Sequence, residues 1–355
     1  MLVNVKKYFS NLFIGREILY TNSGRSALQA IFDDFNLHGS KVAIQSFICT
    51  NFFAPFLIQN NIEPVALDLA KDSLNVSLSE VKRVYEKNKD LKAVLIVHTF
   101  GIANPEIGKI ADFCRQKEII LIEDCVYCLG LSYKGKLLGT YGDAAIFSFH
   151  KSLGFFIGSA YLKNKGRISI NPIKYKRNNL DLFRLIKLIP FAPKTISLFR
   201  PIKQKTNFKI EPKKTEVLSA PWYTNYFYTS SNKLKIDKRS EVAISLYETI
   251  NSKVKLNPKL IRQNNFFYSI PIFVKDKDKD KVYEELIKQG ISCNKRWIEP
   301  LSTSELLLKK HPLRNCPNAN VVSKKIINIL INPKLSKKQI KNKAEKISKV
   351  LVNYI

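Results

Sequence analysis

Short apolar runs alternate with helix-like patterns along the first 165 residues. The apolar runs have the length of buried strands and lie at Lys41–Gln45, Pro64–Leu69, Leu91–Val97, Glu118–Ile122 and Ala144–Phe149. Apolar residues recur at helical spacing after Ser26, over Phe47–Leu57, from Ser77 to about Asn88, and over Pro105–Lys117. This alternation predicts an α/β fold with a mainly parallel sheet covered by helices on both faces.

The two ends of this region follow a different pattern. Residues 1–20 are interpreted as a short lead-in, and the run Ile157–Leu162 is predicted to be a strand that turns back.

The second half of the chain predicts a smaller α+β domain. The expected helices are Lys238–Ser252, Asp280–Gln289, Pro317–Ile329 and Ser336–Val352, and the expected strands are Phe266–Val274 and Gly290–Trp297. We therefore divide the chain into a large domain, residues 1–235, and a small C-terminal domain, residues 236–355. The large domain carries a basic insertion at about residues 163–230.

The net charge of +30 is the one unusual feature of the composition. It fits a nucleic-acid or anionic partner, but it also fits a chain biased towards lysine. Lysines are scattered along the whole length, and no aromatic-basic motif or helix-turn-helix pattern is present, so no nucleic-acid partner is expected. The six cysteines show no repeated spacing, so we expect neither a disulfide scaffold nor a metal site.

The localisation expected from the sequence is cytoplasmic. No segment reaches the roughly 18 apolar residues of a membrane span, and the N-terminal apolar stretch is too interrupted for a signal peptide. Within the basic segment 163–214, residues 180–191 form an amphipathic basic pattern. It fits a weak contact with the inner face of an anionic membrane, a dimer contact, or a helix packed on the core, and we favour packing.

Two polar side chains follow neighbouring apolar runs and suggest chemistry. Asp124 follows one run closely, and Lys151 lies just past Ala144–Phe149. Ligands in open α/β sheets bind beyond the carboxyl ends of the strands, which would bring these two groups to one edge. A lysine amine condenses with a carbonyl, and an aspartate can hold a pyridine nitrogen protonated. The turn Ser23–Ser26 opens a helix, where free N–H groups can bind a phosphate. A plain N-cap would have the same residues.

Several segments, taken in order, resemble one family. They are Ser23–Leu28, Pro64–Asp68, Val97–Gly101, Ile122–Cys125, Gly139–Ala145, Phe147–Phe149, Lys151–Leu153, Cys316–Ala319 and Ile331–Pro333. The set resembles the DegT/DnrJ family of pyridoxal-phosphate sugar aminotransferases, over about residues 18–165 and 265–352. The resemblance implies the fold-type-I aminotransferase architecture, pyridoxal 5'-phosphate as cofactor, and a homodimer. It also implies transfer of an amino group, with glutamate as the expected donor, to a keto-sugar nucleotide in surface-polysaccharide or lipopolysaccharide synthesis.

The same resemblance implies roles for individual residues. Lys151 would attach the cofactor and move the proton, and Asp124 would bind the pyridine nitrogen. The remaining expected cofactor contacts are Gly24, Arg25, Ser26 and Ser148 at the phosphate, Cys49 and Tyr127 near the ring, and His98 facing the same crevice. For His98, a structural role with satisfied hydrogen bonds is the alternative.

Some positions depart from the family pattern. Ser148 and Lys151 are closer together than usual, and Ile157-Gly158-Ser159 stands where the family has Glu-Gly-Gly. Cys49 replaces a stacking aromatic, Tyr127 replaces a glutamine, and a cross-dimer Asn-Tyr-Arg segment has no clear counterpart between residues 223 and 238. Two alternatives follow from these departures. One is a non-catalytic binding or scaffold subunit. The other is a related sugar dehydratase, because such enzymes have histidine in place of the lysine and His150 precedes Lys151.

Overall fold

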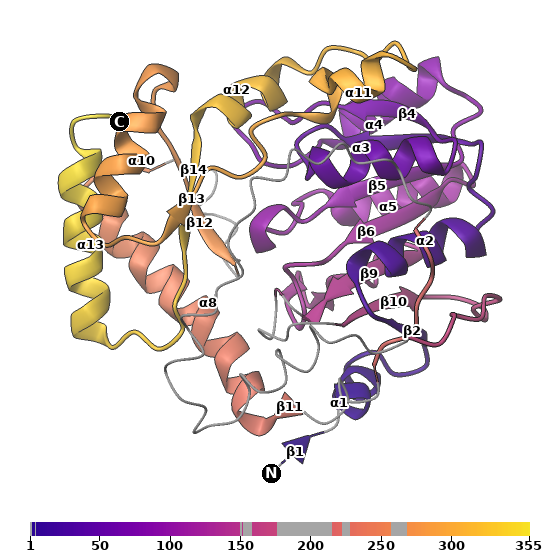
Figure 1. The fold of residues 1–355 in the computed structure, drawn as a ribbon, viewed down its shortest axis with the longest axis horizontal. Helices are drawn as coiled ribbons and strands as arrows, with labels where there is room; N and C mark the ends of the chain where they lie inside the picture. The colour runs from indigo at the N-terminus through magenta and orange to yellow at the C-terminus, as the bar shows by residue number, and fades with distance from the viewer. Residues whose placement is uncertain are drawn as a thin grey trace.

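The computed structural model shows, in its described residues, a seven-stranded and a three-stranded sheet flanked by helices, together with two small two-stranded sheets (Figure 1). It describes residues 2–3, 5–149, 151, 158–175, 215–221, 228–256 and 268–355. The segment 180–191, for which a membrane contact, a dimer contact and core packing were considered, lies outside these residues, as does His150. In the described part of the chain, no helix combines the length and the apolar character that crossing a bilayer requires.

A seven-stranded sheet forms the centre of the larger part, in the order β2-β10-β9-β6-β5-β3-β4 within the described residues. The strands are β2 (Glu17–Thr21), β3 (Lys41–Gln45), β4 (Glu63–Leu67), β5 (Ala93–Val97), β6 (Ile120–Asp124), β9 (Ala144–Ser148) and β10 (Ser159–Lys163). The strands from β9 to β4 run parallel, and β10 runs antiparallel to both β9 and β2. The predicted parallel sheet and the strand that turns back are therefore confirmed.

Helices pack against this sheet where the apolar periodicity predicts them. They are α2 (Gly24–Asp34), α3 (Thr50–Gln59), α4 (Leu78–Lys87) and α5 (Ile107–Gln116). The Ser23 side chain accepts a hydrogen bond from the Ser26 N–H, and the Ser77 side chain accepts one from the Glu80 N–H. The helices α2 and α4 therefore each start at a side-chain N-cap. The helix expected from Phe47 begins only at Thr50, because Ser46 still bonds to Leu67 of the neighbouring strand and Cys49 is the N-cap.

The interpretation of residues 1–20 as a lead-in was wrong. This segment forms β1 (Leu2–Val3), α1 (Val5–Leu12) and β2, which lies at the edge of the large sheet. Phe9 and Phe13 of this segment are buried and pack against Phe147 of β9. The edge strand is only partly buried, so it lacks the continuous apolar run that marks the central strands.

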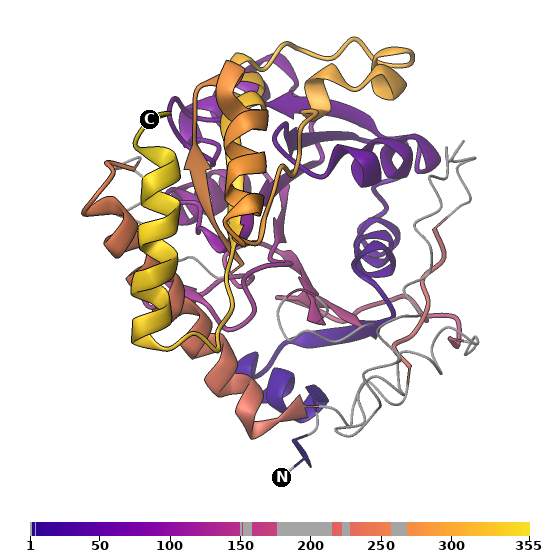
Figure 2. The same cartoon turned by 60° about the vertical axis from the view of Figure 1, so that its left-hand side comes forward.

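The C-terminal part is built on a smaller sheet in the order β12-β14-β13. Its elements are α8 (Ser230–Asn251), β12 (Ser269–Phe273), α10 (Lys279–Lys288), β13 (Cys293–Asn294), α11 (Glu305–Leu308), α12 (Pro317–Lys325), β14 (Ile326–Leu330) and α13 (Lys337–Leu351). Short elements complete the chain: β7 (Ser132–Tyr133), β8 (Lys136–Leu137), β11 (Tyr228–Thr229), and the single turns Thr99–Gly101, Asp276–Asp278 and Leu301–Thr303. Figure 2 shows α10 and α13 side by side on one face of this sheet.

Two C-terminal predictions need correction. The helix expected over Pro317–Ile329 ends at Lys325, because the isoleucine-rich run that follows forms β14 between two antiparallel neighbours. Of the expected strand Gly290–Trp297, only Cys293–Asn294 pairs as a strand. The expected boundary at residues 235–236 falls within α8, and the division into two domains remains a prediction.

Segments after β13 join the small sheet to the large one. The Leu301 N–H donates to the Ser46 carbonyl at 2.7 Å, and the Thr50 hydroxyl donates to the Glu299 carbonyl at 2.6 Å. Asp68 follows β4 and accepts from the N–H groups of Asn318 and Ala319. This carboxylate thereby caps the first turn of α12, whose N–H groups lack partners inside the helix. These contacts hold the C-terminal segment against the carboxyl edge of the large sheet.

Candidate active site

The predicted site residues gather at one edge of the large sheet. Asp124 is the last residue of β6, Ser148 the last of β9 and Thr21 the last of β2. These strands share one direction, because β2 and β9 both run antiparallel to β10. Their carboxyl ends therefore meet at the same edge, where open α/β sheets bind ligands.

Lys151, Asp124 and Tyr127 form the centre of this site. Lys151 Nζ lies 4.3 Å from the centroid of the buried Tyr127 ring. Burial raises the pKa of the Asp124 carboxyl, and the nearby Lys151 ammonium opposes this shift. Burial alone would lower the pKa of Lys151, but Tyr127 and Asp124 together raise it above its ordinary value. The ammonium and the carboxylate therefore stabilise each other's charge in a largely dry environment.

Arg296 reaches the same centre from the C-terminal segment. Its Nη1 donates to the Tyr127 hydroxyl at 3.3 Å, and its guanidinium lies 5.3 Å from the centroid of the Tyr268 ring. Within the described residues it forms no ion pair with a carboxylate. Two cations, Lys151 and Arg296, thus flank one tyrosine, and Asp124 is the acid near Lys151. This charge balance favours an anionic ligand.

Aromatic residues line the region behind Arg296. The Trp297 ring stacks on Phe100 at a centroid distance of 4.6 Å and meets Phe47 edge-on at 5.2 Å. Trp297 and Phe100 both have left-handed backbones, with φ of +59° and +56°. This conformation is unfavourable for bulky residues and tends to be kept at functional sites. The sequence prediction did not include Arg296 or Trp297 among the site residues, although a cationic-aromatic pair just after a strand is a detectable signal.

The predicted phosphate turn lies beside the end of β9. Ser159 pairs in register with both Thr21 and Ser148, so the turn that follows Thr21 and Ser148 lie at the same edge of the sheet, with one strand between them. The Ser26 Oγ lies 2.7 Å from Asn22 Oδ1 and 2.8 Å from the Glu216 carbonyl, so the protein itself already satisfies this hydroxyl. The contacts of Gly24 and Ser26 with a phosphate therefore remain predictions.

Two other predicted residues, Cys49 and Arg25 of α2, lie at or against the first turn of α3. Cys49 is the N-cap of α3, is half-buried, and lies close enough to Lys151 to influence its pKa. The Arg25 guanidinium lies 5.3 Å from the centroid of the Phe52 ring. Cys49 thus lies near Lys151, while the described contact of Arg25 is with an aromatic ring, and the predicted contacts of both residues with the cofactor stay predictions.

His98 has a structural role in this arrangement. The Asn104 N–H donates to its Nδ1 at 3.1 Å, so Nε2 carries the hydrogen and donates to Glu123 Oε2 at 3.0 Å. Both nitrogens are engaged in a fully buried setting. These bonds match the structural alternative for His98, and the prediction that its ring faces the cofactor stays a prediction.

The same neighbourhood contains three groups that resemble metal ligands. Ligand atoms of His98, Glu123 and Cys125 lie within 4.8 Å of one another. Glu123, however, accepts hydrogen bonds from the N–H groups of Gly139, Tyr141 and Gly142 as well as from His98. Burial also raises the pKa of Cys125 well above its ordinary value, which disfavours the thiolate. We assign this cluster a structural role.

Comparison with known proteins identifies the family. The sequence model of the DegT/DnrJ/EryC1/StrS aminotransferase family matches residues 6–160 and 234–348, which is most of the chain. The protein therefore belongs to this family. The resemblance that the sequence motifs predicted is confirmed.

Two curated relatives match shorter stretches. GDP-perosamine synthase of Vibrio cholerae is 40% identical over 93 residues, which cover 26% of this chain and 24% of that protein. The dTDP-4-dehydro-2,3,6-trideoxy-D-glucose 4-aminotransferase of Saccharopolyspora spinosa is 32% identical over 133 residues, or 38% and 34% of the two chains. The matched stretches span about a quarter to a third of the length of these relatives.

A solved structure extends the comparison to the whole fold. A DegT DnrJ EryC1 StrS aminotransferase from Brucella abortus has a TM-score of 0.71 to this protein at 19% sequence identity. The superposition covers 97% of this chain and 89% of that chain. The predicted α/β fold of the aminotransferase type is therefore confirmed.

Proposed function

We propose that this protein is a pyridoxal-phosphate-dependent aminotransferase that transfers an amino group to the keto group of a nucleotide-linked sugar. The amino donor is an amino acid, and we propose glutamate. The observation that carries the proposal is that Lys151 and the buried Asp124 lie at the same carboxyl edge of the sheet, close enough for each to shift the pKa of the other. Family membership and the sugar substrates named in the two relatives support it.

The residues of this site fit pyridoxal 5'-phosphate. Asp124 is a buried carboxylate, and a protonated pyridine nitrogen requires such an acidic partner. Lys151 supplies the amine that can bond to the aldehyde carbon, and the N-terminus of α2 lies at the same edge to hold the phosphate. When bound, this cofactor withdraws electrons from the carbon that loses or gains a proton. The Lys151 amine is the group placed to carry that proton.

Arg296 suits the anionic part of a substrate. Both expected substrates carry anions: a carboxylate on the amino donor and phosphates on the nucleotide. A half-buried guanidinium without an acidic partner is a strong and directional binder for either group. We therefore infer that Arg296 binds and orients one of the two substrates.

The finer expectations belong to this proposal as well. The reaction would serve the synthesis of surface polysaccharide or lipopolysaccharide in the cytoplasm, and the protein would act as a homodimer. A non-catalytic binding subunit is the competing function. The observation that favours it is Tyr127, whose ring lies against Lys151 at the position where the family has a glutamine.

The test is a spectrum combined with an assay. Purified protein incubated with pyridoxal phosphate should show a visible absorbance band, and turnover of a nucleotide keto-sugar with glutamate should be measurable. Lys151→Ala should lose both, while Lys165→Ala, which removes an exposed lysine, should keep both. A band without any turnover would favour the binding subunit, and a protein that takes up no cofactor would refute the proposal.

A further inference from the structure

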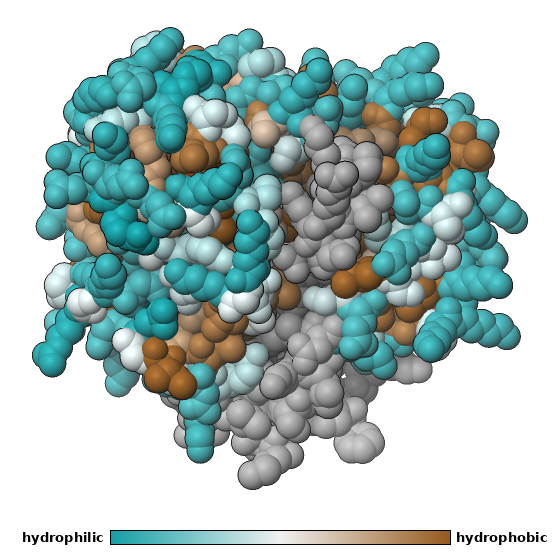
Figure 3. All heavy atoms as spheres, turned by 180° about the vertical axis from the view of Figure 1, so that it is seen from behind, coloured by the Kyte–Doolittle hydropathy of each residue, from teal (hydrophilic) through white to brown (hydrophobic). Residues whose placement is uncertain are grey.

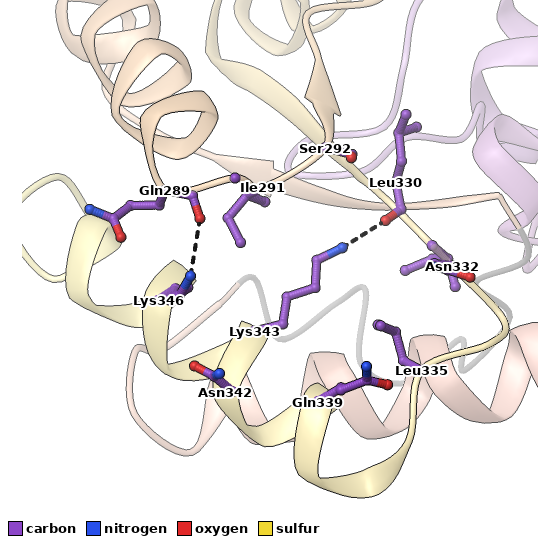
Figure 4. A pocket seen from close by; sticks show the side chains of 12 residues that line it. Gln289, Ile291, Ser292, Leu330, Asn332, Leu335, Gln339, Asn342, Lys343 and Lys346 are labelled. Atoms are coloured by element: carbon purple, nitrogen blue, oxygen red, sulfur yellow. Dashed lines mark hydrogen bonds between the residues drawn. The ribbon is translucent and has the colours of Figure 1, made fainter. Parts of the chain in front are cut away.

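A groove on the C-terminal part of the molecule has no role in the proposed reaction. It has a volume of about 470 Å³ and lies between α13, the turn that follows α10 and the residues that follow β14 (Figure 4). Residues 289–292 form one wall, and residues 330–335 form another. None of Lys151, Asp124 or Arg296 lines it. Its size falls within the range of about 300–1,000 Å³ that is typical of small-molecule sites.

One side of α13 gives the groove its polar character. Gln339, Asn342, Lys343 and Lys346 are spaced at i, i+3, i+4 and i+7, so they form a single stripe along the helix. The apolar residues of α13, among them Ile340 and Ala344, lie on another stripe and are buried in the core. The amide and ammonium groups therefore face the groove together, as the side chains drawn in Figure 4 show.

The two lysines reach across the groove to backbone carbonyls. Lys343 Nζ donates to the Leu330 carbonyl at 3.1 Å, and Lys346 Nζ donates to the Gln289 carbonyl at 3.4 Å. An ammonium group has three N–H donors, so each lysine can donate further hydrogen bonds into the groove. Burial also lowers the pKa of Lys343, which shows that its charge is partly desolvated.

Among the described residues that line the groove there is no aspartate or glutamate. Two other half-buried lysines have acidic partners, since Lys41 pairs with Asp90 and Lys163 pairs with Asp34, whereas the buried Lys279 donates to the Ser323 carbonyl. The charge of Lys343 is partly desolvated and its described partner is a carbonyl, and unlike Lys279 it lines a groove that a ligand can enter. Since a desolvated cation is costly without a counter-charge, this site gains from an added anion.

We propose that this groove is a binding site for a small organic phosphate. Lysines at i and i+3 have Cβ atoms about 5–6 Å apart, so both ammonium groups can contact one doubly charged group. The Gln339 and Asn342 amides supply hydrogen bonds to a polar body, and Ile291 and Leu335 supply apolar contacts. The proposal does not depend on the function assigned to the Lys151 site.

The test is calorimetric titration of the purified protein with glucose 1-phosphate as the probe. Lys343→Met and Lys346→Met should each weaken binding at least tenfold. Lys349→Met is the matched control, because Lys349 is an exposed residue of α13 that does not line the groove. It removes the same charge and should leave the affinity unchanged.

Three outcomes would overturn the proposal. They are an absence of binding to the unmodified protein, equal weakening in all three variants, and full affinity in both groove variants. Equal weakening would mean that the probe responds only to the overall positive charge. Circular dichroism checks that each variant folds. If Lys343→Met does not fold, Lys346→Met decides, because Lys346 is exposed and its replacement leaves the core intact.

Discussion

The ammonium group of Lys151 lies against the face of the Tyr127 ring, 4.3 Å from its centroid. The hydroxyl of the same tyrosine accepts a hydrogen bond from Arg296. One buried side chain therefore contacts both cations of the candidate site: its ring faces Lys151, and its hydroxyl interacts with Arg296 and with Lys151. This arrangement separates two contributions that mutation can test individually.

Replacing Tyr127 with phenylalanine should keep the contact of its ring with Lys151 and lose the interactions of its hydroxyl with Arg296 and Lys151. We expect cofactor uptake to persist and turnover to fall roughly tenfold to a hundredfold, because a hydrogen bond to a charged group contributes about 1.5–3 kcal/mol. Tyr127→Leu, which also removes the ring, should reduce turnover further. Absorbance spectra and steady-state kinetics of both variants provide the measurement, and equal activity of the two would contradict the role of the ring.

Replacing Asp124 with asparagine should lower the pKa of Lys151. Burial already acts to lower this pKa, and the carboxylate is one of the groups that hold it above its ordinary value. Without the negative charge, the neutral amine should appear at lower pH. The measurement is the pH dependence of Lys151 labelling by an amine reagent, followed by mass spectrometry. The control is Asp112→Asn, which removes an exposed carboxylate of α5. An unchanged pH midpoint of Lys151 labelling in Asp124→Asn would refute the influence of Asp124 on the pKa of Lys151.

Replacing Arg296 with methionine should raise KM for one of the two substrates about tenfold or more and change kcat less. The reason is that a charge-assisted hydrogen bond to an anion is lost, and each 1.4 kcal/mol corresponds to a factor of ten. Lys295→Met is a matched control, since Lys295 is the adjacent residue and pairs with Asp280 instead. A change in kcat alone, with both KM values intact, would argue against substrate binding by Arg296.

The sequence predicted the large sheet well because its strands are buried on both faces. Such strands appear as continuous apolar runs, so β5, for example, is visible without any partner. The edge strand β2 and the isoleucines of β14 were missed, each for its own reason. β2 is only partly buried, and β14 follows α12 without a turn residue, so its pairing depends on strands far away in sequence.

The candidate site was predictable only where a strand end carries it. Asp124 and Lys151 follow strands directly, and the sheet brings them together. Arg296 comes from a segment more than 100 residues later, and its position depends on contacts such as the bond between Leu301 and Ser46. For His98, the sequence could not show the hydrogen-bond partners, because Asn104 and Glu123 meet it only in the folded chain.

The polarity of the surface agrees with the composition of the sequence. Seen from behind, the described residues present a largely hydrophilic face with scattered apolar patches (Figure 3). This matches the polar and charged residues that are scattered along the whole sequence. The groove beside α13 is an exception because its lysines converge on one pocket, which a count of charges along the chain cannot reveal.

Asp34 should stabilise the folded protein through a charge buried at the end of α2. Its side chain is fully buried and accepts hydrogen bonds from the Tyr161 hydroxyl at 2.6 Å, the Lys163 ammonium at 2.7 Å, and the N–H and hydroxyl of Ser169. Burial acts to raise its pKa, but these donors outweigh burial and lower it from 3.8 to about 2. Because the folded-state pKa is lowered, the stabilisation is present above the unfolded-state value and is lost as the pH falls.

We therefore expect Asp34→Asn to lower the free energy of unfolding at pH 7 by about 2 kcal/mol, from about 1.4 kcal/mol per pKa unit. The difference from the unmodified protein should narrow as the pH falls from about 4 towards 2, where the carboxylate itself becomes protonated. Urea unfolding across this pH range provides the measurement, with Asp112→Asn, in an exposed ion pair, as the control. A stability difference that stays constant down to pH 2 would show that Asp34 acts through packing and not through its charge.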